Sequence, residues 1–142
     1  MSSLAGTWEL IEWTATVGER LQRPFGGDVV GKLTYTADGH MWAALMRRDR
    51  RPVGATTLAG ATGSDRAAAA AGYLNYAGTY TDLGDRVIHH VEVSLMPNWV
   101  GKDQERIVRW VDGDLELSTD PETGRSGEPI INRLRWRRVS GW

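Results

Sequence analysis

QERIVRWVDGDLELST, residues 104–119, contains two runs of alternating apolar and polar residues on either side of Asp112-Gly113. Alternation with a period of two is typical of β-strands. An Asp-Gly pair between such runs is typical of a tight hairpin turn, because glycine adopts a positive φ at little cost. The stretch therefore predicts a β-hairpin. Two more tight turns are expected, at Asp38-Gly39 and Leu83-Gly84.

Outward from this hairpin, the same patterns predict eight β-strands. They are Thr7–Thr16, Gly31–Ala37, His40–Met46, Gly78–Thr81, Arg86–Leu95, Gln104–Val111, Asp114–Thr119 and Ile130–Arg138. One helix is expected over Ser64–Ala77, SDRAAAAAGYLNYA, because Thr62 or Ser64 can cap it and alanine has the highest helix propensity. This helix would lie between the third and fourth strands.

The connections between the predicted strands alternate in length. The tight turns separate long connections at roughly residues 17–30, 47–77, 96–103 and 120–129. In an up-and-down meander, successive connections lie at opposite ends. The sequence therefore predicts an all-β fold, an eight-stranded antiparallel up-and-down barrel formed by residues 1–142 as one domain, with a closed floor and an elaborated mouth. A two-sheet sandwich explains the alternation less well.

Composition argues against several functional classes. The net charge is -1 with both signs interspersed, so no nucleic-acid partner is expected. The absence of cysteine excludes disulfides and thiolate nucleophiles, and no phosphate-loop or dinucleotide motif indicates a cofactor. The N-terminal residues lack the pattern of a leader peptide, and no apolar run approaches the roughly 18 residues of a membrane span. A cytoplasmic location is expected.

Several segments resemble a microbial lipocalin-like domain family. Gly6-Thr7-Trp8 is similar to the G-x-W opening of lipocalins, and the other segments follow in the family's order over nearly the whole chain. These segments are PFG (24–26), GKLTYTADGHM (31–41), GYLNYAGTY (72–80), HHVEVSLMPNWVG (89–101) and RLRWRR (133–138). The resemblance implies that Trp8 closes the barrel floor, with Arg137 or Arg138 packed across it. It also places Leu10 and Glu12 inward, where periodicity alone leaves Ile11 and Trp13 as equal competitors.

Side-chain alternation predicts the interior face of the other strands. The inward residues of strand 86–95 would be Val87, His89, Val91, Val93 and Leu95. Those of the later strands would be Arg106, Val108, Trp110, Leu115, Leu117, Asn132, Leu134 and Trp136. At residues 37–39, a three-residue turn would place Met41, Ala43 and Leu45 inward, and a two-residue turn would place Trp42 inward. The first is preferred because its face is more apolar.

Three residues are candidates for acid-base catalysis: His89, Glu12 and Tyr80. An inward imidazole can exchange protons near neutral pH, and Tyr80 lies diagonally across the Leu83-Gly84 turn, where it could orient the ring. A carboxylate enclosed in a barrel needs a partner or a proton. The structural alternatives are a hydrogen-bonded core histidine and an ion pair of Glu12 with Arg106 or a late-strand arginine.

Other inward residues are candidates for ligand contacts. Arg106 could bind a carboxylate or enolate oxygen, and Tyr35 and Asn132 could hydrogen-bond a carbonyl or hydroxyl group. Trp99, in the segment MPNWVG (96–101), could form part of a lid at the mouth. Met41, Trp110 and Trp136 complete the expected ligand-binding set. Each of these side chains could instead serve only the core.

These features predict a protein that binds a hydrophobic small molecule in its barrel. The favoured interpretation is a cofactor-free isomerase, cyclase, lyase or hydratase of small-molecule biosynthesis. The alternative is a binding or carrier protein for a lipid-like or polyketide-like metabolite, and a structural barrel with a filled core is the third. No metal site is expected, because adjacent His89 and His90 point to opposite faces of a strand.

The outer wall of the predicted barrel carries apolar residues. Ile11, Trp13, Ile107 and Val111 would face outward if the inward set above holds. Exposed apolar area of this kind is expected to be covered by the helix or by a second copy of the chain in a homodimer.

Overall fold

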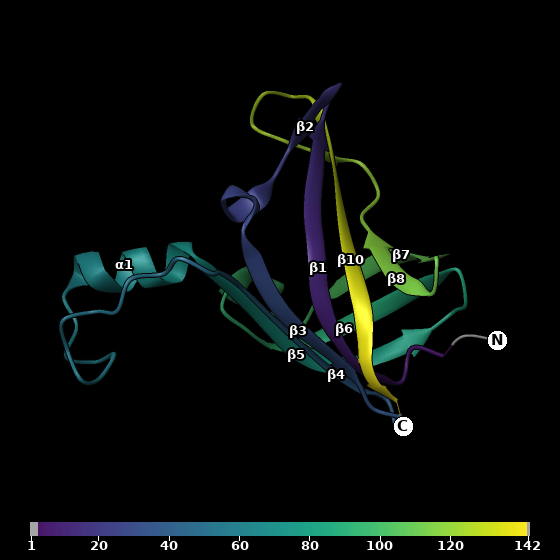
Figure 1. Cartoon of the computed structure of the whole chain (residues 1–142), viewed down its shortest axis with the longest axis horizontal. Helices are drawn as coiled ribbons and strands as arrows, with labels where there is room; N and C mark the ends of the chain where they lie inside the picture. The colour runs from purple at the N-terminus through teal and green to yellow at the C-terminus, as the bar shows by residue number, and fades with distance from the viewer. Residues whose placement is uncertain (1–2, 142) are drawn as a thin grey trace.

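The computed structural model describes residues 3–141 as a closed antiparallel β-barrel with one α-helix (Figure 1). Each of its eight long strands pairs with its neighbour in the chain, and β1 also pairs with β10, which closes the barrel. The long strands are β1 (Gly6–Val17), β3 (Val29–Tyr35), β4 (His40–Arg47), β5 (Tyr73–Asp82), β6 (Arg86–Ser94), β7 (Asp103–Val111), β8 (Asp114–Ser118) and β10 (Pro129–Gly141). The predicted all-β, eight-stranded barrel is confirmed.

Shorter elements lie in the long connections. The strands β2 (Arg20–Gln22) and β9 (Glu122–Thr123) pair with β1 and β10, respectively. The 3-10 helices η1 (Pro24–Gly27) and η2 (Pro97–Trp99) precede β3 and β7. Because neighbouring strands are antiparallel, these connections gather at one end of the barrel, the mouth. The tight turns lie at the other end, the floor, where Gly39, Gly84 and Gly113 have positive φ.

Trp8 closes the floor of the barrel. Its ring is fully buried, and its Nε1 donates a hydrogen bond to the Leu4 carbonyl oxygen at 2.9 Å. The guanidinium group of Arg138 lies over the ring and donates to the carbonyl oxygens of Ser3 and Ala5. The arrangement is the one that the resemblance implied, and the arginine that provides it is Arg138.

The helix α1 (Gly63–Ala71) is shorter than predicted and lies between β4 and β5. Thr62 caps it, because its Oγ1 accepts a hydrogen bond from the Asp65 backbone N–H at 3.1 Å. The predicted helical continuation to Ala77 is wrong. Residues 73–77 begin β5, where pairing such as Leu74 with Leu45 outweighs the local helix preference. The helix buries no side chain and extends away from the barrel, so it does not cover the outer wall (Figure 1).

A bulge in β1 changes which residues face the interior. Leu10 pairs with Trp136 and Glu12 with Arg135, so that Ile11 is the extra residue. Leu10 is buried, but beyond the bulge Glu12 is exposed and Trp13 turns inward. The expected inward position of Glu12 and the expected outward position of Trp13 are therefore wrong, because an inserted residue reverses the alternation.

A second irregularity interrupts the pairing of β5 with β6. Ala77 pairs with Val93 and Gly78 with Val91, which leaves Glu92 as the extra residue. Val91 is buried as predicted, as are Val87 and His89, whereas Val93 and Leu95 are exposed beyond the bulge and the expectation for them is wrong. A Cβ atom at Gly78 would lie 1.8 Å from the His90 carbonyl oxygen, so this close approach requires glycine.

The hairpin between β3 and β4 follows the preferred prediction. Tyr35 pairs with Met41, and the side chains of Met41, Ala43 and Leu45 are all buried. Trp42 on the opposite face is 49% exposed. The more apolar face of β4 therefore points into the barrel.

Candidate ligand-binding site

A cavity of about 420 Å³ occupies the mouth half of the barrel interior. Ligand pockets for small molecules commonly measure roughly 300 to 1,000 Å³, so the cavity is large enough for one such molecule. Most of its wall is apolar or aromatic, with contributions from Trp13, Leu33, Ala43, Leu45, Leu117 and Trp136. Its polar wall comes from Tyr76, His89, Gln104, Arg106, Thr119, Glu122 and Asn132. The barrel is therefore not a fully packed core.

Trp99 lies at the rim of this cavity. It ends the 3-10 helix η2 and is half-buried against the core. Its ring meets the Tyr76 ring edge to face, with centroids 5.9 Å apart and an interplanar angle of 87°. The structure thus places Trp99 beside the cavity, where the sequence placed it.

His89 is held between two tyrosine hydroxyl groups. The Tyr35 hydroxyl oxygen lies 2.6 Å from Nε2, and the Tyr76 hydroxyl oxygen lies 2.6 Å from Nδ1. Burial, assisted by the positive charge of Arg106, lowers the pKa of His89 to about 3. Burial also raises the pKa of both tyrosines, that of Tyr35 most strongly. At neutral pH this cluster consists of a neutral imidazole between two protonated phenols.

The prediction that Tyr80 orients the His89 ring is wrong, because its hydroxyl group is bound elsewhere. The two residues are paired across β5 and β6, but the Tyr80 hydroxyl donates to the Thr36 carbonyl oxygen at 2.8 Å. Its ring instead packs edge to face against Tyr35, with centroids 4.7 Å apart. The partners that orient the imidazole are Tyr35 and Tyr76, which reach it from β3 and β5.

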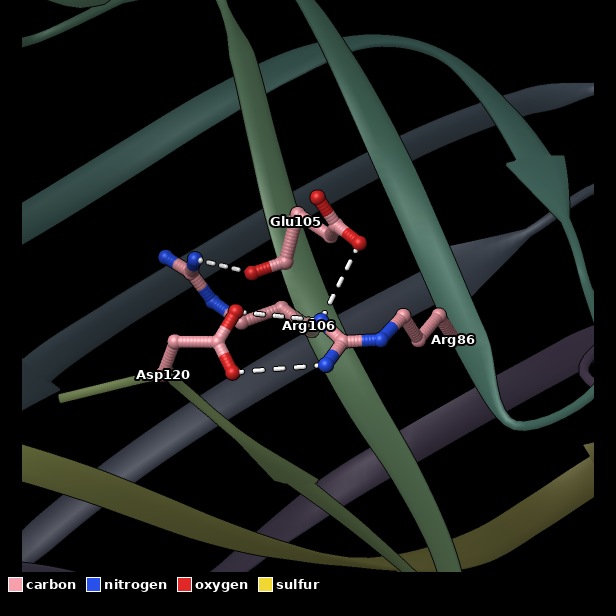
Figure 2. A network of polar contacts seen from close by, with 4 residues as sticks. All are labelled: Arg86, Glu105, Arg106 and Asp120. Atoms are coloured by element: carbon pink, nitrogen blue, oxygen red, sulfur yellow. Dashed lines mark hydrogen bonds and ion pairs between the residues drawn. The ribbon is translucent and has the colours of Figure 1, made fainter.

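Arg106 brings a positive charge to the cavity wall. Its guanidinium donates to the Gln104 Oε1 at 3.1 Å and to the Glu105 carbonyl oxygen at 2.9 Å. The Glu105 carboxylate is bound by Arg86 at 3.0 Å, and Arg86 also binds Asp120 (Figure 2). Within residues 3–141, Arg106 forms no ion pair with a carboxylate, so its charge meets neutral acceptors and is available to a ligand.

Glu12 takes no part in this cavity. Its carboxylate is exposed and lies 3.9 Å from Arg23 Nη1, so Glu12 is neither an interior acid-base group nor the partner of Arg106 that was the structural alternative. A carboxylate in that position is solvated and cannot reach a ligand in the barrel.

Asn132 and Trp13 form a polar contact in the cavity wall. Trp13 Nε1 donates to Asn132 Oδ1 at 2.9 Å, and the Asn132 backbone N–H donates to Thr119 Oγ1 at 3.0 Å. Asn132 therefore lines the cavity as predicted, with its oxygen already paired. Trp136 also lines it, and within the described residues its buried Nε1 has no hydrogen-bond partner.

Three predicted ligand contacts lie elsewhere. Tyr35 and Met41 are fully buried and do not line the cavity. Trp110 packs on Trp8 at the floor, with ring centroids 5.9 Å apart, and is 37% exposed. Depth along the barrel separates these side chains from the cavity, and strand alternation says nothing about depth.

Some residues of the site were missed by sequence reasoning. Tyr76 falls within the predicted helix, although the alternation in GYLNYAGTY also fits a strand that Tyr76 shares with Tyr80. The inward position of Trp13 depends on the bulge at Ile11, and the sequence carries no clear signal for that bulge. Gln104 and Thr119 lie near the mouth, two residues from Arg106 and Leu117, so the same alternation could have placed both on the inward face.

The comparison with protein families agrees with the fold. Residues 5–139 match the model of a lipocalin-like domain, and the chain therefore belongs to this family. It is similar to the 4'-hydroxy-3'-methoxypropiophenone carrier protein ppsC of Aspergillus oryzae, with 41% identity over 87 residues. The alignment covers 55% of this chain and 78% of that protein. No solved structure matches the chain.

Two features of the described residues concern membranes and metal ions. The helix within residues 3–141 is neither long nor apolar enough to span a membrane. In the same range, no group of three or more histidine or acidic side chains is arranged to hold a metal ion. His90 is bound instead to Asp103 and Thr81, each at 2.8 Å.

Proposed function

We propose that this protein is a carrier that binds a small aromatic molecule or a related polyketide-like metabolite in its barrel cavity. The observation that carries the proposal is the cavity itself, about 420 Å³ in volume, with mostly apolar walls and a few polar groups. Pockets of this composition hold the body of a ligand by apolar contact and fix its orientation by a few hydrogen bonds.

The aromatic side chains favour a flat ligand. Trp13, Trp99 and Trp136 come from three separate elements and present indole rings to the cavity. Aromatic rings pack well against one another in stacked or edge-to-face arrangements. The fungal relative is named for an aryl ketone that carries a phenol group, which is a molecule of this kind.

The arrangement of polar groups supports binding better than catalysis. Both nitrogens of His89 are occupied by tyrosines, and with a pKa of about 3 the imidazole does not take up a proton near neutral pH. Glu12 lies outside the barrel, and Tyr80 is bound to the backbone. Of the polar groups, Arg106 can anchor a ligand oxygen without any proton transfer. The isomerase, cyclase, lyase and hydratase alternatives have no comparable support.

A fluorescence titration tests this function. The probe is 4'-hydroxy-3'-methoxypropiophenone, and its binding is expected to quench the three cavity tryptophans with saturation at one molecule per chain. Mass spectrometry of the recovered ligand then separates the two classes of function. An unchanged ligand agrees with a carrier, whereas conversion to an isomer or to a hydrated or cleaved product would show an enzyme. Quenching that never saturates would contradict the proposal for this class of ligand.

A further inference from the structure

The hydrogen bonds of His89 have a direction that burial determines. A neutral imidazole has one N–H donor and one acceptor nitrogen. Because a tyrosine hydroxyl lies 2.6 Å from each nitrogen, one tyrosine must donate to the ring and the other must accept from it. Two arrangements satisfy this condition, and they differ in which tyrosine keeps a free hydroxyl proton.

Tyr35 is the unfavourable place for a hydroxyl proton that is not donated to His89. Its side chain is fully buried and does not line the cavity, and among residues 3–141 its hydroxyl has His89 as its hydrogen-bond partner. If Tyr35 accepted from the ring, its own proton would be buried without an acceptor, which is costly. Tyr35 therefore donates to Nε2. The Nδ1–H of His89 then donates to the Tyr76 hydroxyl oxygen.

Tyr76 is in the opposite situation. It lines the cavity together with His89, and with its oxygen accepting from Nδ1, its own proton has no acceptor among the described residues. We propose that the chain Tyr35, His89 and Tyr76 holds the Tyr76 hydroxyl as a hydrogen-bond donor toward the cavity, so that the cavity selects ligands with an acceptor oxygen such as an aryl ketone carbonyl. This inference rests on the proposed binding function and names a group that the ligand must carry.

Two features strengthen the Tyr76 donor. Hydrogen bonds in a chain polarise one another, and each donation along this chain leaves the next hydroxyl a better donor. Arg106 lies in the same cavity wall. Its positive charge is close enough to His89 and Tyr76 to favour a lower pKa of both groups. A cation beside the donor favours an oxygen with partial negative charge, as a carbonyl oxygen has.

The direction of the chain can be tested without a ligand. Nitrogen-15 NMR of the histidine side chains distinguishes the two neutral tautomers of His89. The proposal expects a proton on Nδ1 and none on Nε2. The opposite tautomer would place the free proton on Tyr35 and overturn the inference. His89→Gln identifies the resonance.

Ligand selection can be tested with a pair of probes. One is 4'-hydroxy-3'-methoxypropiophenone, and the other is 2-methoxy-4-propylphenol, in which a methylene replaces the carbonyl. Wild-type protein is expected to bind the ketone about threefold to tenfold more tightly, as one added hydrogen bond allows. Tyr76→Phe should abolish this preference and leave the affinity for the propylphenol nearly unchanged. Tyr73→Phe is the matched control, because Tyr73 lies in an outer groove and not in the cavity.

A third variant separates positioning from contact. Tyr35→Phe does not alter the cavity wall, but it frees the His89 ring to accept from Tyr76, so the ketone preference should fall. An unchanged preference in this variant would show that Tyr35 does not position the donor. Equal binding of both probes by wild-type protein overturns this inference and leaves the carrier function intact. Failure of both probes to bind contradicts the proposed function and this inference together.

Discussion

The guanidinium carbon of Arg138 lies 4.2 Å from the centroid of the Trp8 ring. The same guanidinium donates to the carbonyl oxygens of Ser3 and Ala5, so one side chain ties the segment before β1 to the end of β10. Because β1 and β10 close the barrel, this contact lies across the seam of the sheet. It also seals the floor below the cavity.

Arg138→Ala is expected to lower the free energy of unfolding by about 1 to 3 kcal/mol, because it removes a cation-π contact and two hydrogen bonds to backbone carbonyls. Urea unfolding followed by tryptophan fluorescence measures the change. Arg137→Ala is the matched control and should change stability by less than about 0.5 kcal/mol, as exposed surface residues usually do. Equal losses in both variants would contradict the role of Arg138.

The buried neutral state of His89 predicts a dependence of stability on pH. The pKa is about 3 in the folded protein and near 6.5 in the unfolded chain, so only the unfolded state binds a proton in the window between them. The stabilisation is complete above pH 6.5 and is lost as the pH falls toward 3. Between pH 7.5 and 5.0 the loss is about 2 kcal/mol from this residue.

Chemical unfolding at a series of pH values tests this prediction. His89→Gln lacks the titrating ring, so its stability should fall less steeply than that of the wild type over the same range. The two curves should converge as the pH falls. Parallel curves would mean that the pKa of His89 is the same in the folded and unfolded states.

Filling the cavity should prevent binding without unfolding the barrel. Ala43 lies in the cavity wall, and Ala43→Phe places a ring in the space that the ligand would occupy. We expect the affinity for 4'-hydroxy-3'-methoxypropiophenone to fall at least about tenfold, a loss of roughly 1.4 kcal/mol. Ala44→Phe is the matched control, because Ala44 lies on the outer face of the same strand. Comparable losses in both variants would place the ligand elsewhere.

Neutralising Glu12 and Arg106 should have different effects. Glu12→Gln removes an exposed charge outside the barrel and should leave affinity and stability within experimental error. Arg106→Gln removes the charge available in the cavity wall and should weaken ketone binding about fivefold or more, since hydrogen bonds to charged groups are the stronger ones. Isothermal titration calorimetry measures both affinities. A larger effect at Glu12 than at Arg106 would contradict the site.

Much of the fold was accessible from local sequence patterns. Asp38-Gly39, Leu83-Gly84 and Asp112-Gly113 mark turns through the backbone freedom of glycine, and the alternation of Met41, Ala43 and Leu45 marks a buried face. The site was less accessible. His89, Arg106, Asn132, Trp99 and Trp136 were placed at the cavity, but Tyr76 and Trp13 were not, and Glu12 was placed on the wrong side.

The sequence by itself determined the turn positions, the inward faces of regular strands and the barrel that they form, because these depend on backbone preferences and a period of two. The tertiary structure alone decided the bulges at Ile11 and Glu92, since a bulge depends on the register of a partner strand distant in the chain. It also decided that His89 meets Tyr35 and Tyr76 rather than Tyr80. Tyr35 reaches His89 from β3, which is not a neighbour of β6, and Tyr76 reaches it from the neighbouring strand β5 although Tyr76 itself pairs with Ser94, so neither contact follows from spacing along the chain.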